Sequence, residues 1–203
     1  MKKLISVIIL VAMLLVCFVS CDNPDLKGVE KLNEESNYVL IEVDGYGEIL
    51  IELYPDVAPQ TVKNFKKLVG EGFYNGLTFH RIIEGFMIQG GDPKGNGTGG
   101  SGENIFGEFS SNGFENNLKH ERGVISMARS ELPNSASSQF FIMHQDASHL
   151  DGKYAAFGKV IYGMETVDEI ATVQTNYNNR PLDKVVMKSV NFVSVEGTKF
   201  ATE

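Results

Sequence analysis

Residues 79–92 are Phe79-His80-Arg81-Ile82-Ile83-Glu84-Gly85-Phe86-Met87-Ile88-Gln89-Gly90-Gly91-Asp92. The pattern predicts two short strands joined by a turn. Because side chains alternate between the two faces of a strand, Arg81 is expected to share a face with Phe79 and Ile83. Met87 and Gln89 are expected to share a face of the second strand. An arginine, a thioether and a carboxamide can then project together from a sheet, although an exposed arginine on a solvated face gives the same pattern.

A second stretch has a similar composition, Ser138-Gln139-Phe140-Phe141-Ile142. Gln139 and Phe141 fall on one face of the predicted strand. A second strand that presents a carboxamide beside an apolar side chain favours a binding or catalytic site over a solvated sheet face.

These stretches resemble the signature of the cyclophilins, the peptidyl-prolyl cis-trans isomerases. Other segments match in the same order, namely Asn96-Gly97-Thr98-Gly99-Gly100, Leu150-Asp151-Gly152-Lys153 and Phe157-Gly158-Lys159-Val160. The resemblance covers residues 37–196. Ordered matches over that length are far more specific than a short motif.

The resemblance implies a mainly β fold, a closed eight-stranded antiparallel β-barrel capped by two α-helices, with the two end strands paired. The 21 glycines also favour a β-rich fold with tight turns. The sequence pattern predicts two strands within 79–92 and others at 38–43, 48–53, 123–128, 138–143, 156–161 and 185–193. It predicts one helix that begins near Pro59 and ends at Gly70, and a second at 163–171.

Composition limits the classes of partner. The chain has 203 residues, of which 42% are hydrophobic and 22% charged, as in a soluble globular protein. The formal charge of −8 gives no basic footprint for nucleic acid or for an anionic membrane surface. We therefore expect no nucleic-acid partner, and any membrane attachment has to come from a lipid or an apolar segment.

The N-terminus is expected to be a targeting segment rather than part of the fold. Residues 1–20 begin with Lys2 and Lys3 and continue with an almost unbroken apolar run, which predicts a signal peptide. An uncleaved membrane anchor is the alternative, since the run is near the lower limit for a membrane span.

Phe18-Val19-Ser20-Cys21 resembles a bacterial lipobox, in which the cysteine takes the lipid. Phe18 departs from the usual leucine, and a plain signal peptide with a spare cysteine is the alternative. We expect lipidation at Cys21, a flexible tether over residues 21–36, the isomerase domain at 37–196 and a tail at 197–203. The protein would then be extracytoplasmic and lipid-anchored to a bacterial membrane.

Other chemistries are not predicted. The only cysteines are Cys17 and Cys21, so the mature domain would have no disulfide, thiolate metal site or cysteine nucleophile. The four histidines lack a carboxylate cluster, so we expect no metal site, and no Ser/His/Asp constellation can be assigned. Residues 95–100 fit G-x-G-x-x-G, but no helix follows to meet a pyrophosphate, so we reject a dinucleotide cofactor and expect no cofactor at all.

Proline isomerisation needs no covalent chemistry. The X-Pro bond rotates over a barrier of about 18–20 kcal/mol that arises from amide resonance. An enzyme has only to bind the twisted amide more tightly than the planar one. In the twisted state the prolyl nitrogen gains a lone pair, and the rigid, permanently charged guanidinium of Arg81 is suited to donate to it.

The resemblance implies that Arg81 is the catalytic residue. It implies a substrate-binding set of Phe86, Met87, Gln89, Gly97, Ala128, Arg129, Ser130, Gln139, Phe141, His149, Leu150 and Tyr154.

The set departs from the common family pattern at three places, one of which is a pair of residues. Arg129-Ser130 replaces a common Asn-Ala pair where the backbone clamps the substrate. His149 stands where many members have a tryptophan that contacts cyclosporin, so weak inhibition by this drug is expected. Tyr154 replaces a histidine of the proline pocket, and activity is expected to survive with altered substrate preference.

We therefore expect a monomeric peptidyl-prolyl cis-trans isomerase that acts on proline-containing polypeptides outside the cytoplasm and assists their folding. The alternative is a non-catalytic module, a chaperone or surface adhesin that holds proline-containing segments. A metal or nucleotide enzyme built on the glycine-rich loop is a third, weaker reading.

Overall fold

The computed structural model describes residue 26 and residues 28–195. Its helices are α1 (Pro59–Gly70) and α2 (Met164–Ala171), with short 3-10 turns at Ser110–Asn112 and Ser148–Leu150. The strands are β1 (Glu30–Lys31), β2 (Tyr38–Val43), β3 (Gly47–Leu53), β4 (Arg81–Ile83), β5 (Met87–Gly90), β6 (Val124–Met127), β7 (Phe140–Met143), β8 (Ala156–Tyr162) and β9 (Met187–Ser194). All of the predicted strands and both predicted helices are present.

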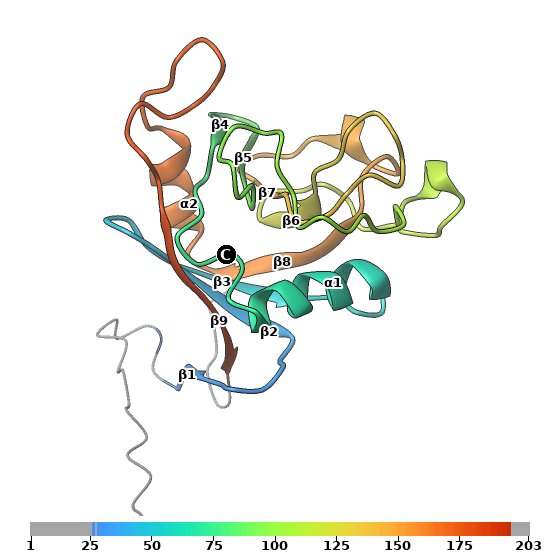
Figure 1. Cartoon of the computed structure of the whole chain (residues 1–203), viewed down its shortest axis with the longest axis horizontal. Helices are drawn as coiled ribbons and strands as arrows, with labels where there is room; N and C mark the ends of the chain where they lie inside the picture. The colour runs from blue at the N-terminus through green and yellow to red at the C-terminus, as the bar shows by residue number, and fades with distance from the viewer. Residues whose placement is uncertain (1–25, 27, 196–203) are drawn as a thin grey trace, which may run out of the picture.

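The strands of the described chain form one antiparallel sheet in the order β1-β9-β2-β3-β8-β6-β7-β5-β4 (Figure 1). The prediction of a closed eight-stranded barrel is wrong in two respects. The described residues form nine strands, and the unpredicted one, the two-residue β1, is too short to leave a pattern in the sequence. Within residues 28–195 the sheet is also not closed by a ladder, since the chain before β4 and the chain before β9 are joined only by an isolated bridge, Thr78↔Val186. The predicted pairing of the first and last strands is present as β2 with β9.

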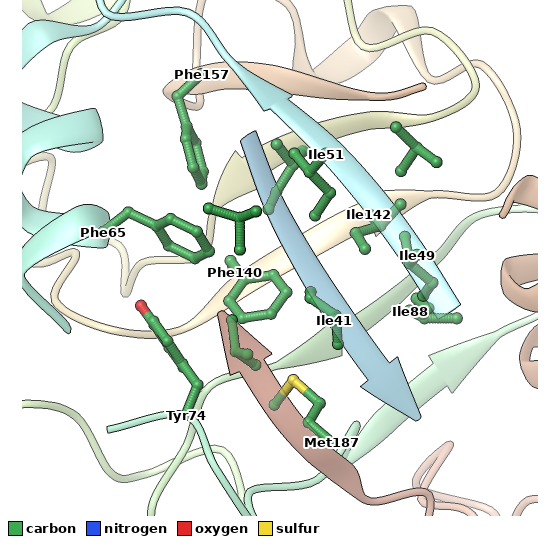
Figure 2. Close-up of a cluster of buried hydrophobic side chains, with 14 of the residues drawn as sticks. Ile41, Ile49, Ile51, Phe65, Tyr74, Ile88, Phe140, Ile142, Phe157 and Met187 are labelled. Atoms are coloured by element: carbon green, nitrogen blue, oxygen red, sulfur yellow. The ribbon is translucent and has the colours of Figure 1, made fainter. Parts of the chain in front are cut away.

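The main hydrophobic core lies between the sheet and both helices, since α1 and α2 each bury apolar side chains in it. Helix α1 begins at Pro59, as expected, and buries one apolar stripe that includes Val62 and Phe65. The Phe65 ring lies 5.1 Å from Tyr74, 5.5 Å from Phe140 and 5.2 Å from Phe157, measured between ring centroids (Figure 2). These rings connect α1 to β7 and β8, and so they fix the strand that carries part of the candidate site.

The segment predicted as a flexible tether is in part docked on the sheet. Leu26 is 3% exposed and packs with Leu40, Leu50 and Val193. Strand β1 pairs with β9, and the backbone N–H of Leu32 donates to the carbonyl of Phe192 at 2.9 Å. Leu40 of β2 and Leu50 of β3 are apolar side chains on the outward face, and the N-terminal segment removes them from water. The tether prediction is therefore wrong for this part of residues 21–36.

The signal peptide, Cys21 and the tail at 197–203 lie outside the described residues. Within residues 26 and 28–195, no helix has the length and apolar character needed to cross a bilayer.

Candidate active site

Strands β4, β5 and β7 place the catalytic candidate and its neighbours side by side. Arg81 pairs with Gln89 across β4 and β5, and Gln89 pairs with Phe141 across β5 and β7. The guanidinium Nη1 of Arg81 donates to Oε1 of Gln89 at 3.2 Å and lies 3.8 Å from Sδ of Met87. The predicted group of arginine, thioether and carboxamide is therefore assembled as expected from the strand alternation.

A chain of hydrogen bonds continues from Gln89 into the glycine-rich loop. The Nε2 of Gln89 donates to Oε1 of Gln139 at 2.9 Å. The Nε2 of Gln139 donates in turn to the carbonyls of Gly97, at 3.1 Å, and Gly99, at 2.8 Å. Because each side-chain amide is held by a hydrogen bond to the next, Oε1 of Gln89, which accepts the hydrogen bond from Arg81, has a fixed position.

One expectation about the faces is wrong. Phe79 was expected on the face of Arg81, but it is fully buried in the main core together with Ile82 and Ile88. Strand β4 begins only at Arg81, so the alternation does not extend back to Phe79. Ile83 does lie on the site side, against the cluster that contains Met87.

The apolar residues of the predicted set form a second cluster beside Arg81. It includes Phe86, Met87, Ala128, Phe141, Leu150 and Tyr154. The cluster is more closely packed than the exposed patch that was expected, since Met87 is 1% exposed and Phe141 is 5% exposed. The more accessible surface comes from the half-buried rings of Phe86 and Tyr154 and from the exposed His149, which stacks on Phe86 at 5.7 Å.

The side chain of Arg129 has a place that the sequence did not suggest. Its guanidinium carbon lies 4.7 Å from the Tyr154 ring centroid and 5.0 Å from that of Phe109. The same guanidinium donates to the carbonyls of Lys153, Ser130 and Glu131. Two of the three departures from the family pattern, Arg129 and Tyr154, therefore contact each other and join two loops.

A cavity of about 550 Å³ opens next to these groups. Ser130 lies on its rim, where its backbone N–H donates to the hydroxyl of Ser135 at 3.0 Å. Six members of the predicted set line the cavity, namely Gln89, Gly97, Ala128, Arg129, Ser130 and Gln139. Arg81 contacts this group through Gln89, and the apolar cluster contacts it through Ala128. The predicted residues are thus brought together, with His149 at the outer edge beside Phe86.

The glycine-rich loop wraps around a carboxylate of the protein itself. Oxygens of the buried Asp92 accept hydrogen bonds from the backbone N–H groups of Lys94, Asn96 and Gly97. Burial raises the pKa of Asp92, but these backbone donors outweigh it and the pKa is lowered. A Cβ at Gly99 would clash with this carboxylate, which accounts for the glycine. The G-x-G-x-x-G match therefore reflects an internal capping turn.

The fold forms a Ser/His/Asp arrangement that could not be assigned from the sequence. Behind the site, Nε2 of His120 lies 3.0 Å from the hydroxyl of Ser126, and Nδ1 lies 3.2 Å from Oδ1 of Asp151. Ser126 is fully buried and His120 is 1% exposed, so no substrate can reach the hydroxyl and the group is structural. The three residues are far apart in the sequence and no motif joins them, so only the fold could reveal the arrangement.

His120 supports both sides of the site. Its ring stacks on Phe141, with centroids 6.0 Å apart, and meets Tyr154 edge-on at 6.5 Å. Burial lowers the pKa of His120, and the Asp151 carboxylate opposes this shift only in part. The imidazole is therefore neutral at physiological pH and acts as a positioning residue.

Comparison with known proteins agrees with this geometry. The family model described as "Cyclophilin type peptidyl-prolyl cis-trans isomerase/CLD" matches residues 38–192. Peptidyl-prolyl cis-trans isomerase CYP18-1 of Arabidopsis thaliana is 45% identical over 71% of this chain and 89% of its own length. Peptidyl-prolyl cis-trans isomerase-like 2 of Gibberella zeae is 38% identical over 82% of this chain, which spans only 30% of that longer protein.

A solved structure has the same fold. It is a cyclophilin type peptidyl-prolyl cis-trans isomerase of Cryptosporidium parvum, crystallised in the presence of the dipeptide Ala-Pro. The TM-score is 0.71 at 36% sequence identity, covering 77% of this chain and 99% of that one. The family prediction is confirmed: this chain belongs to the cyclophilin-type peptidyl-prolyl cis-trans isomerases.

Proposed function

We propose that this chain accelerates X-Pro rotation by presenting the Arg81 guanidinium to the prolyl nitrogen of a bound polypeptide. The observation that carries the proposal is the hydrogen-bond chain from Arg81 through Gln89 to Gln139, which ends at the rim of the cavity. A donor that is already oriented needs no reorganisation when the amide twists, so it stabilises the transition state more than the planar ground state.

The remaining residues of the set would bind the substrate. The rings of Phe86 and Tyr154, together with Leu150, offer an apolar surface for the pyrrolidine ring beside Arg81. The polypeptide backbone would lie along the 550 Å³ cavity, where Gln89 and Gln139 supply amide groups. Met87 and Phe141 are so deeply buried that they shape this surface from below.

The test compares the purified protein with its Arg81→Ala variant. We expect the wild type to accelerate cis-to-trans conversion of a model Ala-Pro peptide. The variant should be at least tenfold slower, which corresponds to at least about 1.4 kcal/mol of barrier reduction. Lys63→Ala, on the exposed face of α1, is the matched control and should leave the rate unchanged. Equal rates for the wild type and Arg81→Ala would overturn the proposal.

The second candidate function is a binding module that holds proline-containing segments, as a chaperone or surface adhesin. The observation that favours it is that the loop residues of the site differ from the common family pattern. Arg129 lies over Tyr154, and His149 stacks on Phe86. The same experiment separates the two functions. Slow isomerisation by both proteins, with proline peptides still bound by the wild type, would support the module.

The physiological setting is likewise a proposal. A lipid on Cys21 would hold the protein outside the cytoplasm, on a bacterial membrane, where it would assist the folding of proline-containing polypeptides. The relatives named above are from plants, fungi and a protozoan, so this setting rests on the sequence of the N-terminus alone. Because Leu26 is docked on the sheet, the five residue-to-residue steps from Cys21 to Leu26 span at most about 18 Å. The domain would therefore stay close to the bilayer.

Two measurements test this setting. In a bacterial host the wild type should partition into detergent and carry an acyl mass on its N-terminal cysteine, whereas Cys21→Ala should do neither. A wild type that stays in the aqueous phase would refute lipidation. Sedimentation of the protein in detergent should give the mass of one chain, as expected for a monomer.

A further inference from the structure

A second cavity, of about 350 Å³, lies on the other side of the loop that follows β5. Three cationic side chains line it, those of Lys94, Arg180 and Lys184. All three are exposed, and within the described chain none of them is ion-paired. This local excess of positive charge stands out in a protein whose formal charge is −8.

Nearby carboxylates offset the three cations only in part. Asp92 contributes to its wall, but this residue is 1% exposed and its oxygens already accept the N–H groups of the glycine-rich loop. Asp183 precedes Lys184 in the sequence but does not line the cavity. An incoming anion would therefore meet three cations without competition from a free carboxylate of the protein.

The cavity is held in shape by hydrogen bonds between the two loops that form it. Nη2 of Arg180 donates to the carbonyl of Gly95 at 3.0 Å. The loop that carries Arg180 is itself fixed, because the N–H of Ile82 in β4 donates to the carbonyl of Asn179 at 2.8 Å. A guanidinium positioned in this way can bind a carboxylate without losing much rotamer freedom.

His80 adds an unexplained polar group to the same wall. It is 6% exposed, and neither ring nitrogen makes a well-formed hydrogen bond, although the backbone of Thr78 lies close enough to act on the pKa of the ring. Burial is the main cause of its lowered pKa, so the ring is neutral at physiological pH. Unpartnered buried nitrogens are costly, and their retention beside three cations agrees with a polar ligand at this position.

The two cavities share a wall. Lys94 lines both of them, and His80 directly precedes Arg81 in the chain. The two cavities therefore meet at Lys94, and a substrate side chain that extended past this residue would enter the second cavity.

We propose that the 350 Å³ cavity is a specificity subsite that binds an acidic side chain, aspartate or glutamate, of the polypeptide being isomerised. The inference rests on the proposed function, because it assigns a substrate class to that site. Complementary charge favours the acidic client, and three cations disfavour a basic one.

The experiment uses peptides with one Ala-Pro core and a single glutamate, glutamine or lysine at each of the three positions on either side. For one position, kcat/KM for glutamate should exceed that for glutamine about fivefold in low salt, as expected for a few partly exposed ion pairs. The preference should fall below twofold in 1 M NaCl, where the Debye length is about 3 Å. The lysine peptide should be the poorest substrate.

The triple variant Lys94→Gln, Arg180→Gln, Lys184→Gln should abolish the preference, so that the glutamate and glutamine peptides are isomerised with equal kcat/KM. Lys63→Gln, an exposed cation on α1, is the control and should keep the preference. Equal rates for glutamate and glutamine peptides at every position would overturn the inference, as would a preference that survives the triple variant.

Two further outcomes separate the sources of failure. If no peptide is accelerated, the proposed function fails. The subsite is then tested by titrating the wild type and the triple variant with the same peptides. Tighter binding of the glutamate peptide by the wild type alone would support the subsite, and equal affinities would refute it. Inorganic phosphate should compete with the glutamate peptide and not with the glutamine peptide. Phosphate binding in the cavity without any effect of peptide charge would show a small-anion site and refute the client subsite.

Discussion

The two sides of the candidate active site are built in different ways. The strand side comprises Arg81, Met87, Gln89 and Phe141, which the ladder between β4, β5 and β7 positions, and Gln139, which directly precedes β7 and is held by hydrogen bonds. The loop side comprises Arg129, Ser130, His149 and Tyr154, and side-chain contacts between distant loops set theirs. The strand side follows the pattern expected from the sequence, whereas the loop side has its own arrangement. The chemistry is therefore expected to depend on the strands, and substrate preference on the loops.

The largest effect should follow from changing the donor of the strand side while keeping its charge. Arg81→Lys removes the planar fork that donates to Gln89, so the cation is no longer held in one position. We expect kcat/KM to fall about 100-fold, or about 2.7 kcal/mol, within the range for loss of one preorganised donor. Rates measured with an Ala-Pro peptide check this. Activity within threefold of the wild type would show that charge alone is sufficient.

The next effect concerns the residue that supports both sides. His120→Phe keeps an aromatic ring against Phe141 and Tyr154 but leaves the buried hydroxyl of Ser126 without its partner. We expect the free energy of unfolding in urea to fall by about 2 kcal/mol. The double variant His120→Phe, Ser126→Ala should recover part of this loss, because both polar partners are then absent. A double variant no more stable than the single one would contradict the assignment.

The same variant tests the pH dependence. The pKa of His120 is lowered in the folded protein, so the folded state binds fewer protons than the unfolded state. The stability that neutral His120 provides is present above its unfolded pKa of about 6.5 and is lost as the pH falls below it. Urea unfolding of the wild type should therefore show declining stability on acidification. The decline should be smaller in His120→Phe, with the remainder coming from groups such as His80, whose pKa is also lowered.

A third effect comes from the outer edge of the loop side. His149 is exposed and stacks on Phe86. Replacing it with tryptophan, as in His149→Trp, enlarges the apolar surface, and we expect cyclosporin to inhibit about tenfold more strongly. Inhibition titrations of both proteins provide the measurement. Unchanged inhibition would mean that other loop residues, and not His149, weaken drug binding.

The smallest effect should come from Arg129. Arg129→Ala removes the contact with Tyr154 and the bonds to neighbouring carbonyls, and a partly exposed cation–π contact contributes about 0.5–1 kcal/mol. We expect KM to rise two- to fivefold with kcat nearly unchanged, because the loop side affects binding and not the barrier. A fall in kcat equal to that of Arg81→Lys would remove the distinction between the two sides.

Most of the fold could be predicted from the sequence because its elements are local. The β2–β3 hairpin has alternating β-branched residues on either side of a turn with a glycine at positive φ, and α1 has a proline at its start and a glycine at its end. Strand β1 could not be predicted, since a two-residue strand has no period of its own. It exists because Leu26 and the outward face of β2 and β3 bury each other.

The strand side of the site was determined by the sequence alone, because the alternation of side chains and the ordered family motifs specify which groups face one another. Only the tertiary structure decided the rest. It placed Arg129 on Tyr154, joined His120 to Ser126 and Asp151, and gathered Lys94, Arg180 and Lys184 around one cavity. These groups are distant in the chain and share no spacing rule. Their meeting depends on how the loops pack, which is set by the whole core and not by any local pattern.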